Sequence, residues 1–199
     1  MAKIGRPTLV LIAGPNGAGK TTLYETRIAP RLKSPFVNAD VIQRDELKDR
    51  RPEAAYEAAR LAEERRRSYL ETGKSFVTET VFSHPSKLEL ILKARAEGFR
   101  VIVFHIGVDD PDLSVARVAE RVAEGGHAVP EDKIRARYDR NSPLIRQAVL
   151  MSELAHVFDN SGLNTPPRRI LTFTHGRIGF ALPRIPDWVL SIYSEDLLV

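Results

Sequence analysis

The sequence predicts an α/β fold, a mainly parallel sheet between two layers of helices, and three observations support this prediction. Apolar runs with strand composition alternate along the chain with segments of helical composition. Consecutive parallel strands need connections of helix length, which these segments supply. The runs at residues 8–13 and 100–107 are almost continuously apolar, which is typical of strands buried on both faces.

Turn residues and helix breakers divide the first half of the chain into predicted elements. The strands expected there are residues 8–13, 36–39 and 75–80, and the expected helices are residues 20–28 and 53–72. Asp40 follows the second strand and is a candidate N-cap for a helix after it. In the long helix, the candidate buried positions are Tyr56, Leu61, Tyr69 and Leu70.

For the second half of the chain, the sequence predicts a lid and a hairpin in addition to further α/β units. The helices expected there are residues 85–98, 110–124 and 131–154, and the strands are residues 100–107 and 157–159. Because Gly125-Gly126-His127 interrupts the helical pattern, the excursion over about residues 110–146 predicts a helical lid. Residues 168–183 predict a C-terminal β-hairpin. The length suits one domain over residues 1–199.

Composition excludes several classes of function. The chain has no cysteine, which excludes disulfides, thiolate metal sites and a cysteine nucleophile, and we expect a cytoplasmic protein. No apolar run reaches the length that spans a membrane, so we expect no membrane association. The net charge is only +4, so the placement of the arginines matters more than their sum.

The segment from Gly14 to Thr22 carries the strongest chemical signal. It reads Gly14-Pro15-Asn16-Gly17-Ala18-Gly19-Lys20-Thr21-Thr22 and matches the spacing G-x-x-x-x-G-K-[ST] between a buried strand and a helix. Such glycines let backbone N–H groups turn inward as an anion cradle. A chance glycine-rich turn is the alternative, and the match in both spacing and context argues against it. The sequence therefore predicts a P-loop NTPase fold, a three-layer α/β/α sandwich.

The predicted ligands of this loop are ATP and Mg²⁺. Lys20 is expected to reach the β- and γ-phosphates, and the Thr21 hydroxyl to ligate the metal. Thr22 can donate to another phosphate. Nucleotide-dependent switches and kinases both contain such a loop, so other residues must distinguish between these functions.

Two carboxylates at predicted strand ends favour a kinase. Parallel sheets bind ligands beyond the carboxyl ends of their strands, where Asp40 and Glu79 fall. A carboxylate at that edge can accept the proton of a substrate hydroxyl during phosphoryl transfer. For Asp40 the alternative is helix capping. Glu79 has three interpretations: it binds substrate hydroxyls, holds a magnesium-bound water, or pairs with an arginine.

Arginine is concentrated in the predicted lid. The residues are Arg117, Arg121, Arg135, Arg137, Arg140 and Arg146. Guanidinium groups that close over the phosphates stabilise the charge of phosphoryl transfer, and we assign this role to Arg121 and Arg137. We expect about half of the six to form a solvated surface. Residues 65–67 form a second basic run, but glutamates precede it and no aromatic residues accompany it, so we expect no nucleic-acid partner there.

With these residues identified, the chain resembles the zeta toxin family of P-loop kinases over about residues 8–161. The resemblance is carried by residues 14–22, Asn38-Ala39-Asp40, Glu79-Thr80-Val81-Phe82-Ser83, the arginines and Gly125-Gly126-His127 of the lid, and Asp159-Asn160-Ser161.

The resemblance implies an enzyme that uses ATP to phosphorylate a small-molecule hydroxyl, UDP-N-acetylglucosamine in the better-known members, under the control of an antitoxin protein. It matches Lys20 to the phosphate-loop lysine and Asp40 to the catalytic base. It places Glu79 and Thr80 at the substrate and Arg117 at the nucleotide. Because the chain lacks much of the insertion that builds the sugar-nucleotide pocket of the large toxins, another hydroxyl acceptor stays open. A nucleotide-dependent switch or binding module is the alternative function.

Overall fold

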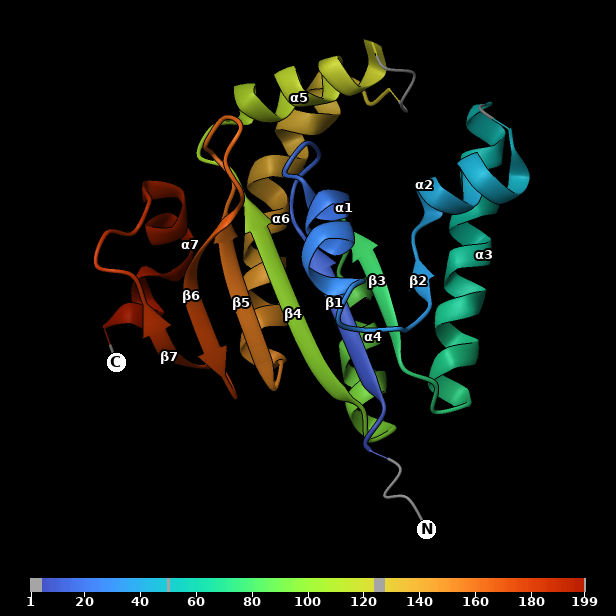
Figure 1. Cartoon of the computed structure of the whole chain (residues 1–199), viewed down its shortest axis with the longest axis horizontal. Coiled ribbons are helices and arrows are strands. Elements are labelled where there is room, and N and C mark those ends of the chain that lie inside the picture. The colour runs from blue at the N-terminus through green and yellow to red at the C-terminus, as the bar shows by residue number, and fades with distance from the viewer. Residues whose placement is uncertain (1–4, 50, 124–127, 199) are drawn as a thin grey trace.

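The computed structural model describes residues 5–49, 51–123 and 128–198. Its strands form one seven-stranded sheet with the order β2-β3-β1-β4-β5-β6-β7 (Figure 1). The strands are β1 (Thr8–Ala13), β2 (Phe36–Val37), β3 (Phe76–Thr80), β4 (Arg100–Gly107), β5 (Leu154–Asp159), β6 (Arg168–Thr174) and β7 (Arg177–Ala181). The first five pair in parallel, and β6 and β7 add an antiparallel hairpin at the edge. The mainly parallel sheet and the hairpin are therefore confirmed.

The helices connect the strands in the order that the sequence predicts, with one addition. They are α1 (Lys20–Leu23), α2 (Ala39–Val41), α3 (Pro52–Glu71), α4 (Ser86–Ala96), α5 (Pro111–Ala123), α6 (Glu131–Met151) and α7 (Asp187–Leu197). The first two continue as π-helical turns over Tyr24–Ile28 and Ile42–Leu47. None of the helices in the described ranges is long and apolar enough to cross a membrane.

Strand β1 is buried on both faces, because its alternate residues belong to two separate cores. Leu9 and Leu11 pack in the larger core, beneath α3, α4, α6 and α7. Val10 and Ile12 pack in the smaller core, beneath α1 and its continuation. The three layers are thus confirmed. The layer formed by α1 is narrow, and over β5, β6 and β7 this face carries no helix from the described residues (Figure 1).

Two local predictions were wrong. Asn38, not Asp40, caps α2: its Oδ1 accepts hydrogen bonds from the backbone N–H groups of Asp40 (2.8 Å) and Val41 (3.4 Å). Asp40 therefore lies in the first turn of the helix. Tyr56 is 81% exposed, because small residues such as Ala58, which is fully buried, form the face of α3 that packs on the sheet.

The C-terminal helix α7, which the sequence did not predict, packs on β4. Trp188 lies so close to Gly107 that a Cβ there would approach its ring to 2.6 Å. Tyr193 is fully buried, and its hydroxyl lies 2.8 Å from Nδ1 of His105. Burial lowers the pKa of His105 to about 3, so its ring is neutral.

Candidate functional site: a phosphate loop facing converging charges

Two neighbouring segments, β4 and α5, pack closely against the loop between β1 and α1. A Cβ on Gly14 would lie 2.0 Å from the carbonyl oxygen of Ile106 in β4. On Gly17 it would meet the carbonyl oxygen of Ser114 in α5 at 2.6 Å. Gly17 (φ 74°) and Gly19 (φ 86°) also adopt left-handed conformations that other residues rarely accept. Successive amides in such a turn form a concave anion cradle, so the backbone fits a bound triphosphate.

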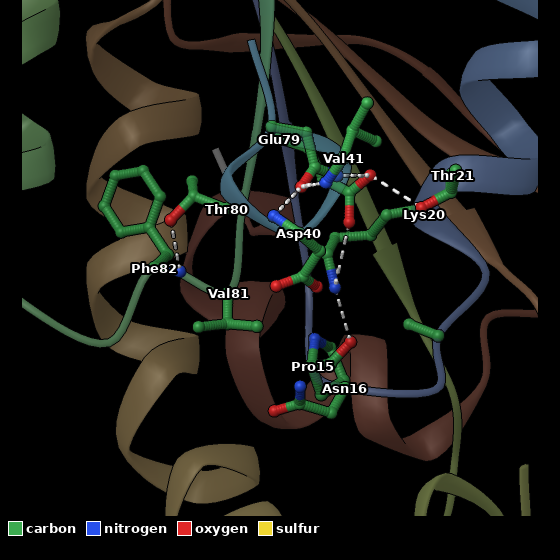
Figure 2. A network of polar contacts seen from close by, with 12 residues as sticks. Pro15, Asn16, Lys20, Thr21, Asp40, Val41, Glu79, Thr80, Val81 and Phe82 are labelled. Carbon is green, nitrogen blue, oxygen red and sulfur yellow. Dashed lines mark hydrogen bonds and ion pairs between the residues drawn. The ribbon is translucent and has the colours of Figure 1, made fainter. Parts of the chain in front are cut away.

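Lys20 is held inside this loop. Its side chain is only 7% exposed, and its Nζ donates a 2.9 Å hydrogen bond to the carbonyl oxygen of Pro15 (Figure 2). Nζ also lies 3.8 Å from Oε1 of Glu79. The ammonium group is therefore already positioned beside the cradle.

Four further charged side chains lie near enough to this ammonium group to shift its pKa. Burial is the main cause that lowers the pKa of Lys20, and the carboxylates of Glu79 and Asp40 oppose it. The guanidinium groups of Arg121 and Arg137 lower the pKa further. The structure therefore brings together the predicted lysine, both predicted carboxylates and both predicted lid arginines.

Glu79 connects β3 to the loop. The register of the parallel pair places it opposite Ile12, near the end of β1. Its Oε2 accepts hydrogen bonds from the Thr21 hydroxyl (2.8 Å) and the Asn38 amide (3.0 Å). A carboxylate beside a phosphate-loop hydroxyl is an oxygen donor set that suits Mg²⁺, so these residues fit the predicted metal.

Asp40 and Thr80, the other residues predicted to bind substrate, differ in whether their side chains are engaged by the protein. Asp40 is exposed and lies beside Lys20 (Figure 2). The Thr80 hydroxyl accepts a 3.0 Å hydrogen bond from the backbone N–H of Phe82, a buried residue with φ 57°. Thr80 thus supports the turn after β3, whereas the Asp40 side chain is open to an incoming molecule.

The arginines of the predicted lid differ in what their side chains contact. Arg137 on α6 donates a 3.4 Å hydrogen bond to the Asn16 side chain in the phosphate loop. Arg117 on α5 donates to the carbonyl oxygens of Asn160 (2.8 Å) and Gly162 (3.2 Å). Arg140 is exposed. Arg137 therefore contacts the phosphate loop directly.

Two other lid arginines form ion pairs away from Lys20. Arg135 pairs with Asp112 (2.6 Å) and Glu131 (2.8 Å) on the surface. Arg146 pairs with Asp196 of α7 at 2.8 Å. The predicted Gly-Gly-His turn at 125–127 lies outside the described residues.

Sequence reasoning gave no individual role to Asn160 or Tyr138, which both hold the site together. The Asn160 side chain donates a 2.9 Å hydrogen bond to the carbonyl oxygen of Ala18, so it fastens the loop after β5 to the phosphate loop. Tyr138 on α6 donates a hydrogen bond to the carbonyl oxygen of Val108. Burial and neighbouring carboxylates raise its pKa to about 12, which keeps the donor protonated. Asn160 lies in Asp159-Asn160-Ser161, one of the segments that carry the family resemblance, and this resemblance is its signal in the sequence.

A cavity of about 360 Å³ adjoins the loop on the side of α6 and α7. It is lined by Pro15 of the phosphate loop, His105 and Val108 of the β4 segment, Tyr138 of α6 and Trp188 of α7, among others. Its volume lies in the range of small-molecule sites.

The strand order, the glycine loop and the charges around Lys20 together define a P-loop kinase fold. The model of the family described as Zeta toxin matches residues 1–164. The chain therefore belongs to the zeta toxin family, as the resemblance predicted.

Individual relatives are distant. A Haemophilus influenzae protein described as uncharacterized is 33% identical over 63 residues, which are 32% of this chain and 45% of that protein. The AvrRxo1-ORF1:-ORF2 complex solved with ATP contains a chain with TM-score 0.69 and 19% identity, over 87% of this chain and 60% of that chain. The PezAT toxin-antitoxin system of Streptococcus pneumoniae gives TM-score 0.58 and 15% identity over 78% and 68%. This chain thus spans less than two thirds of the first two relatives.

Proposed function

We propose that the protein is a kinase that transfers the γ-phosphate of ATP to a hydroxyl group of a small molecule. The observation that carries this proposal is the electrostatic environment of Lys20, because two carboxylates and two arginines of the predicted lid act on its ammonium group. A switch protein needs the cradle and a means of releasing the nucleotide. A kinase also needs a base beside the γ-phosphate and mobile positive charge above it, and Asp40 and Arg137 supply these groups.

Each residue has a defined part in this proposal. The amides of residues 14–19 and the Lys20 ammonium bind the phosphates, with Thr22 as a further donor and Arg117 supporting the nucleotide side. Thr21 and Glu79 hold Mg²⁺, which supplies charge neutralisation on the phosphate oxygens when it is bound. Asp40 orients the acceptor hydroxyl and takes its proton. Arg121 and Arg137 stabilise the charge on the transferring group and help to exclude water.

We further propose UDP-N-acetylglucosamine as the first acceptor to test and an antitoxin protein as a partner. Membership of the zeta toxin family supports both proposals. The PezAT system of S. pneumoniae is a toxin-antitoxin pair, which also supports the partner. Because the chain lacks much of the insertion that builds the sugar-nucleotide pocket of the large toxins, a different small hydroxyl compound is the alternative acceptor.

The test is a search for the phosphorylated product. The protein is incubated with ATP and Mg²⁺, once with UDP-N-acetylglucosamine and once with a metabolite extract, and the products are identified by mass spectrometry. Asp40→Asn is expected to keep ATP binding and to lose transfer, because the amide does not accept the hydroxyl proton. Arg44→Gln, at an exposed position on the π-helical turn after α2, is the matched control.

The outcomes separate the kinase from the switch. Release of free phosphate alone, with no phosphorylated metabolite in either mixture, contradicts the kinase proposal. Equal transfer by the wild type and Asp40→Asn removes Asp40 from the mechanism.

A further inference from the structure

Four side chains lie in line across the sheet face that carries α1. Phe104 of β4 is the register partner of His156 in β5, and His156 is the partner of Thr172 in β6. Thr172 is in turn the partner of Phe180 in β7. Register partners on neighbouring strands point to the same face of a sheet. We call these four residues the β4–β7 row.

Aromatic rings dominate this row, and solvent reaches part of it. The ring of Phe104 lies 5.3 Å from that of His156 and 6.2 Å from that of Phe158, measured between centroids. Phe104 and His156 are half-buried, and Phe180 is 38% exposed. On the face that carries α1, no helix of the described residues covers β5, β6 and β7 (Figure 1). The row is therefore a partly open aromatic surface.

Two arginines lie over aromatic rings on this side of the sheet, one over Phe180 of the row and one over Phe158, a buried neighbour of Phe104. The guanidinium carbon of Arg27 is 5.5 Å from the centroid of Phe158, and that of Arg169 is 5.0 Å from the centroid of Phe180. Neither arginine has a carboxylate partner within the described ranges, although Arg27 donates to the carbonyl oxygen of Pro167 at 3.0 Å. By contrast, Arg60 on α3 pairs with two glutamates. In the part of the chain that the structure describes, no carboxylate thus pairs with the positive charge on this sheet face.

His156 resembles the phenylalanines of the row in presenting an uncharged ring. Its Nδ1 lies 3.1 Å from the Thr172 hydroxyl, which fixes the ring in the row. Burial, with a smaller contribution from Arg169, lowers its pKa, so the imidazole is uncharged at neutral pH. The row therefore offers uncharged ring faces with cationic groups beside them.

We propose that the β4–β7 row binds a single-stranded nucleic acid, with bases stacked on its rings and phosphates paired with Arg27 and Arg169. Aromatic side chains on an open sheet face stack two or three bases in known RNA-binding modules, and the row spans three strand spacings, about 14 Å in total. Arginine beside the rings adds phosphate and cation–π contacts. The unneutralised charge favours a polyanion over a second protein copy. This function goes beyond phosphoryl transfer and needs no nucleotide in the phosphate loop.

The test measures binding of short fluorescein-labelled RNA and DNA single strands by fluorescence anisotropy. Phe180→Ala and Arg169→Ala are each expected to weaken binding roughly ten-fold, because a stacking or phosphate contact is lost. Arg169→Ala is also expected to make the logarithmic salt dependence shallower by about one unit. Two matched controls, Leu92→Ala on α4 (54% exposed) and Arg60→Ala on α3, should bind like the wild type.

Lys20→Ala separates this surface from the phosphate loop. It should bind the single strands with unchanged affinity while losing ATP binding. A loss of strand binding in Lys20→Ala would assign the nucleic acid to the phosphate loop and overturn the proposal.

Further results would also overturn it. Arg60→Ala would contradict the proposal if it weakened strand binding as much as Arg169→Ala does. Equally tight binding of duplex and single strands would contradict it, and so would the absence of binding at low salt. Sedimentation of a dimer that Phe180→Ala dissociates would show that a second copy covers the row instead. Thermal unfolding of each variant verifies that it is folded.

Discussion

The Thr21 hydroxyl donates a 2.8 Å hydrogen bond to Oε2 of Glu79, so the predicted metal ligand and the β3 carboxylate form one unit. This contact links two segments 58 residues apart. Glu79 is therefore placed beside Thr21, where the two residues together would hold the proposed Mg²⁺. Of the three interpretations that the sequence left open for Glu79, this geometry favours the metal role.

Glu79→Gln should weaken binding of ATP in the presence of Mg²⁺ roughly ten-fold or more, because a carboxylate beside the metal is lost. Without Mg²⁺, ATP should bind as well or better, since a negative charge near the phosphates is removed. Titration calorimetry with excess Mg²⁺ and with EDTA measures both affinities. Glu89→Gln, exposed on α4, is the control. An equal loss of affinity in EDTA would contradict the metal role.

Gly19→Ala should abolish most ATP affinity and destabilise the fold. Its left-handed backbone (φ 86°) strains any other residue, and the new Cβ would lie 2.6 Å from Nδ2 of Asn160. Strain of this kind costs roughly 1–3 kcal/mol, and displacement of Asn160 also releases the phosphate loop.

Gly73→Ala is the matched control for this substitution. Gly73 also has a positive φ (62°), but a Cβ there meets nothing within 4 Å. It should lose about 1 kcal/mol of stability and keep full ATP affinity. Urea unfolding and ATP titration of both variants distinguish strain alone from damage to the cradle; equal ATP affinities would contradict the account of Gly19.

Arg137→Ala should lower the rate of phosphoryl transfer by roughly a hundred-fold or more, with little change in ATP affinity. The guanidinium group acts mainly on charge that develops during transfer, and its hydrogen bond to Asn16 is long at 3.4 Å. Turnover is measured with the acceptor identified by mass spectrometry, or as slow ATP hydrolysis without one. Arg140→Ala, exposed on the same helix, should turn over normally. Equal losses in both variants would assign the effect to the helix rather than to Arg137.

The parts of this site that the sequence predicted are those that local chemistry determines. The spacing from Gly14 to Thr21 needs no tertiary information, because one strand, one turn and one helix form the whole cradle. Glu79 was identified because parallel strands end at a common edge, so its distance along the chain did not matter. By contrast, Asn38 and Asp40 are both good cap residues two positions apart, and only the end of β2 decides between them.

Contacts between segments far apart in the chain could not be predicted from the sequence for a different reason: no local pattern indicates the partner. Asn160 is 142 residues from Ala18, and its side chain has no periodic pattern that indicates a partner. The helix α7 carries Trp188 and Tyr193, but its buried face can be recognised only when the position of β4, which the helix covers, is known. Lid arginines look alike in sequence, and the ion pairs of Arg135 and Arg146 come from neighbours in the fold.

The buried pair of His105 and Tyr193 predicts how stability depends on pH. The pKa of His105 is about 3 in the folded protein and near 6.5 in the unfolded chain, so the unfolded chain binds the extra proton as the pH falls. The stability contributed by the neutral ring is fully present above about pH 6.5 and is lost progressively toward pH 3. Within this window the free energy of unfolding should fall by up to about 1.4 kcal/mol per pH unit because of this group.

Urea unfolding from about pH 7 down to about pH 4.5 measures this slope. His105→Asn should be less stable than the wild type at pH 7, because the ring packing against Trp188 is lost, but its stability should fall less steeply with pH. His156, whose pKa burial also lowers, leaves part of the slope in place. His175→Asn changes an exposed residue in the hairpin turn, where asparagine tolerates the positive φ of 49°, and should retain the wild-type slope. If His105→Asn and the wild type lose stability in parallel over this range, the acid sensitivity of the fold comes from other groups and the buried imidazole does not govern it.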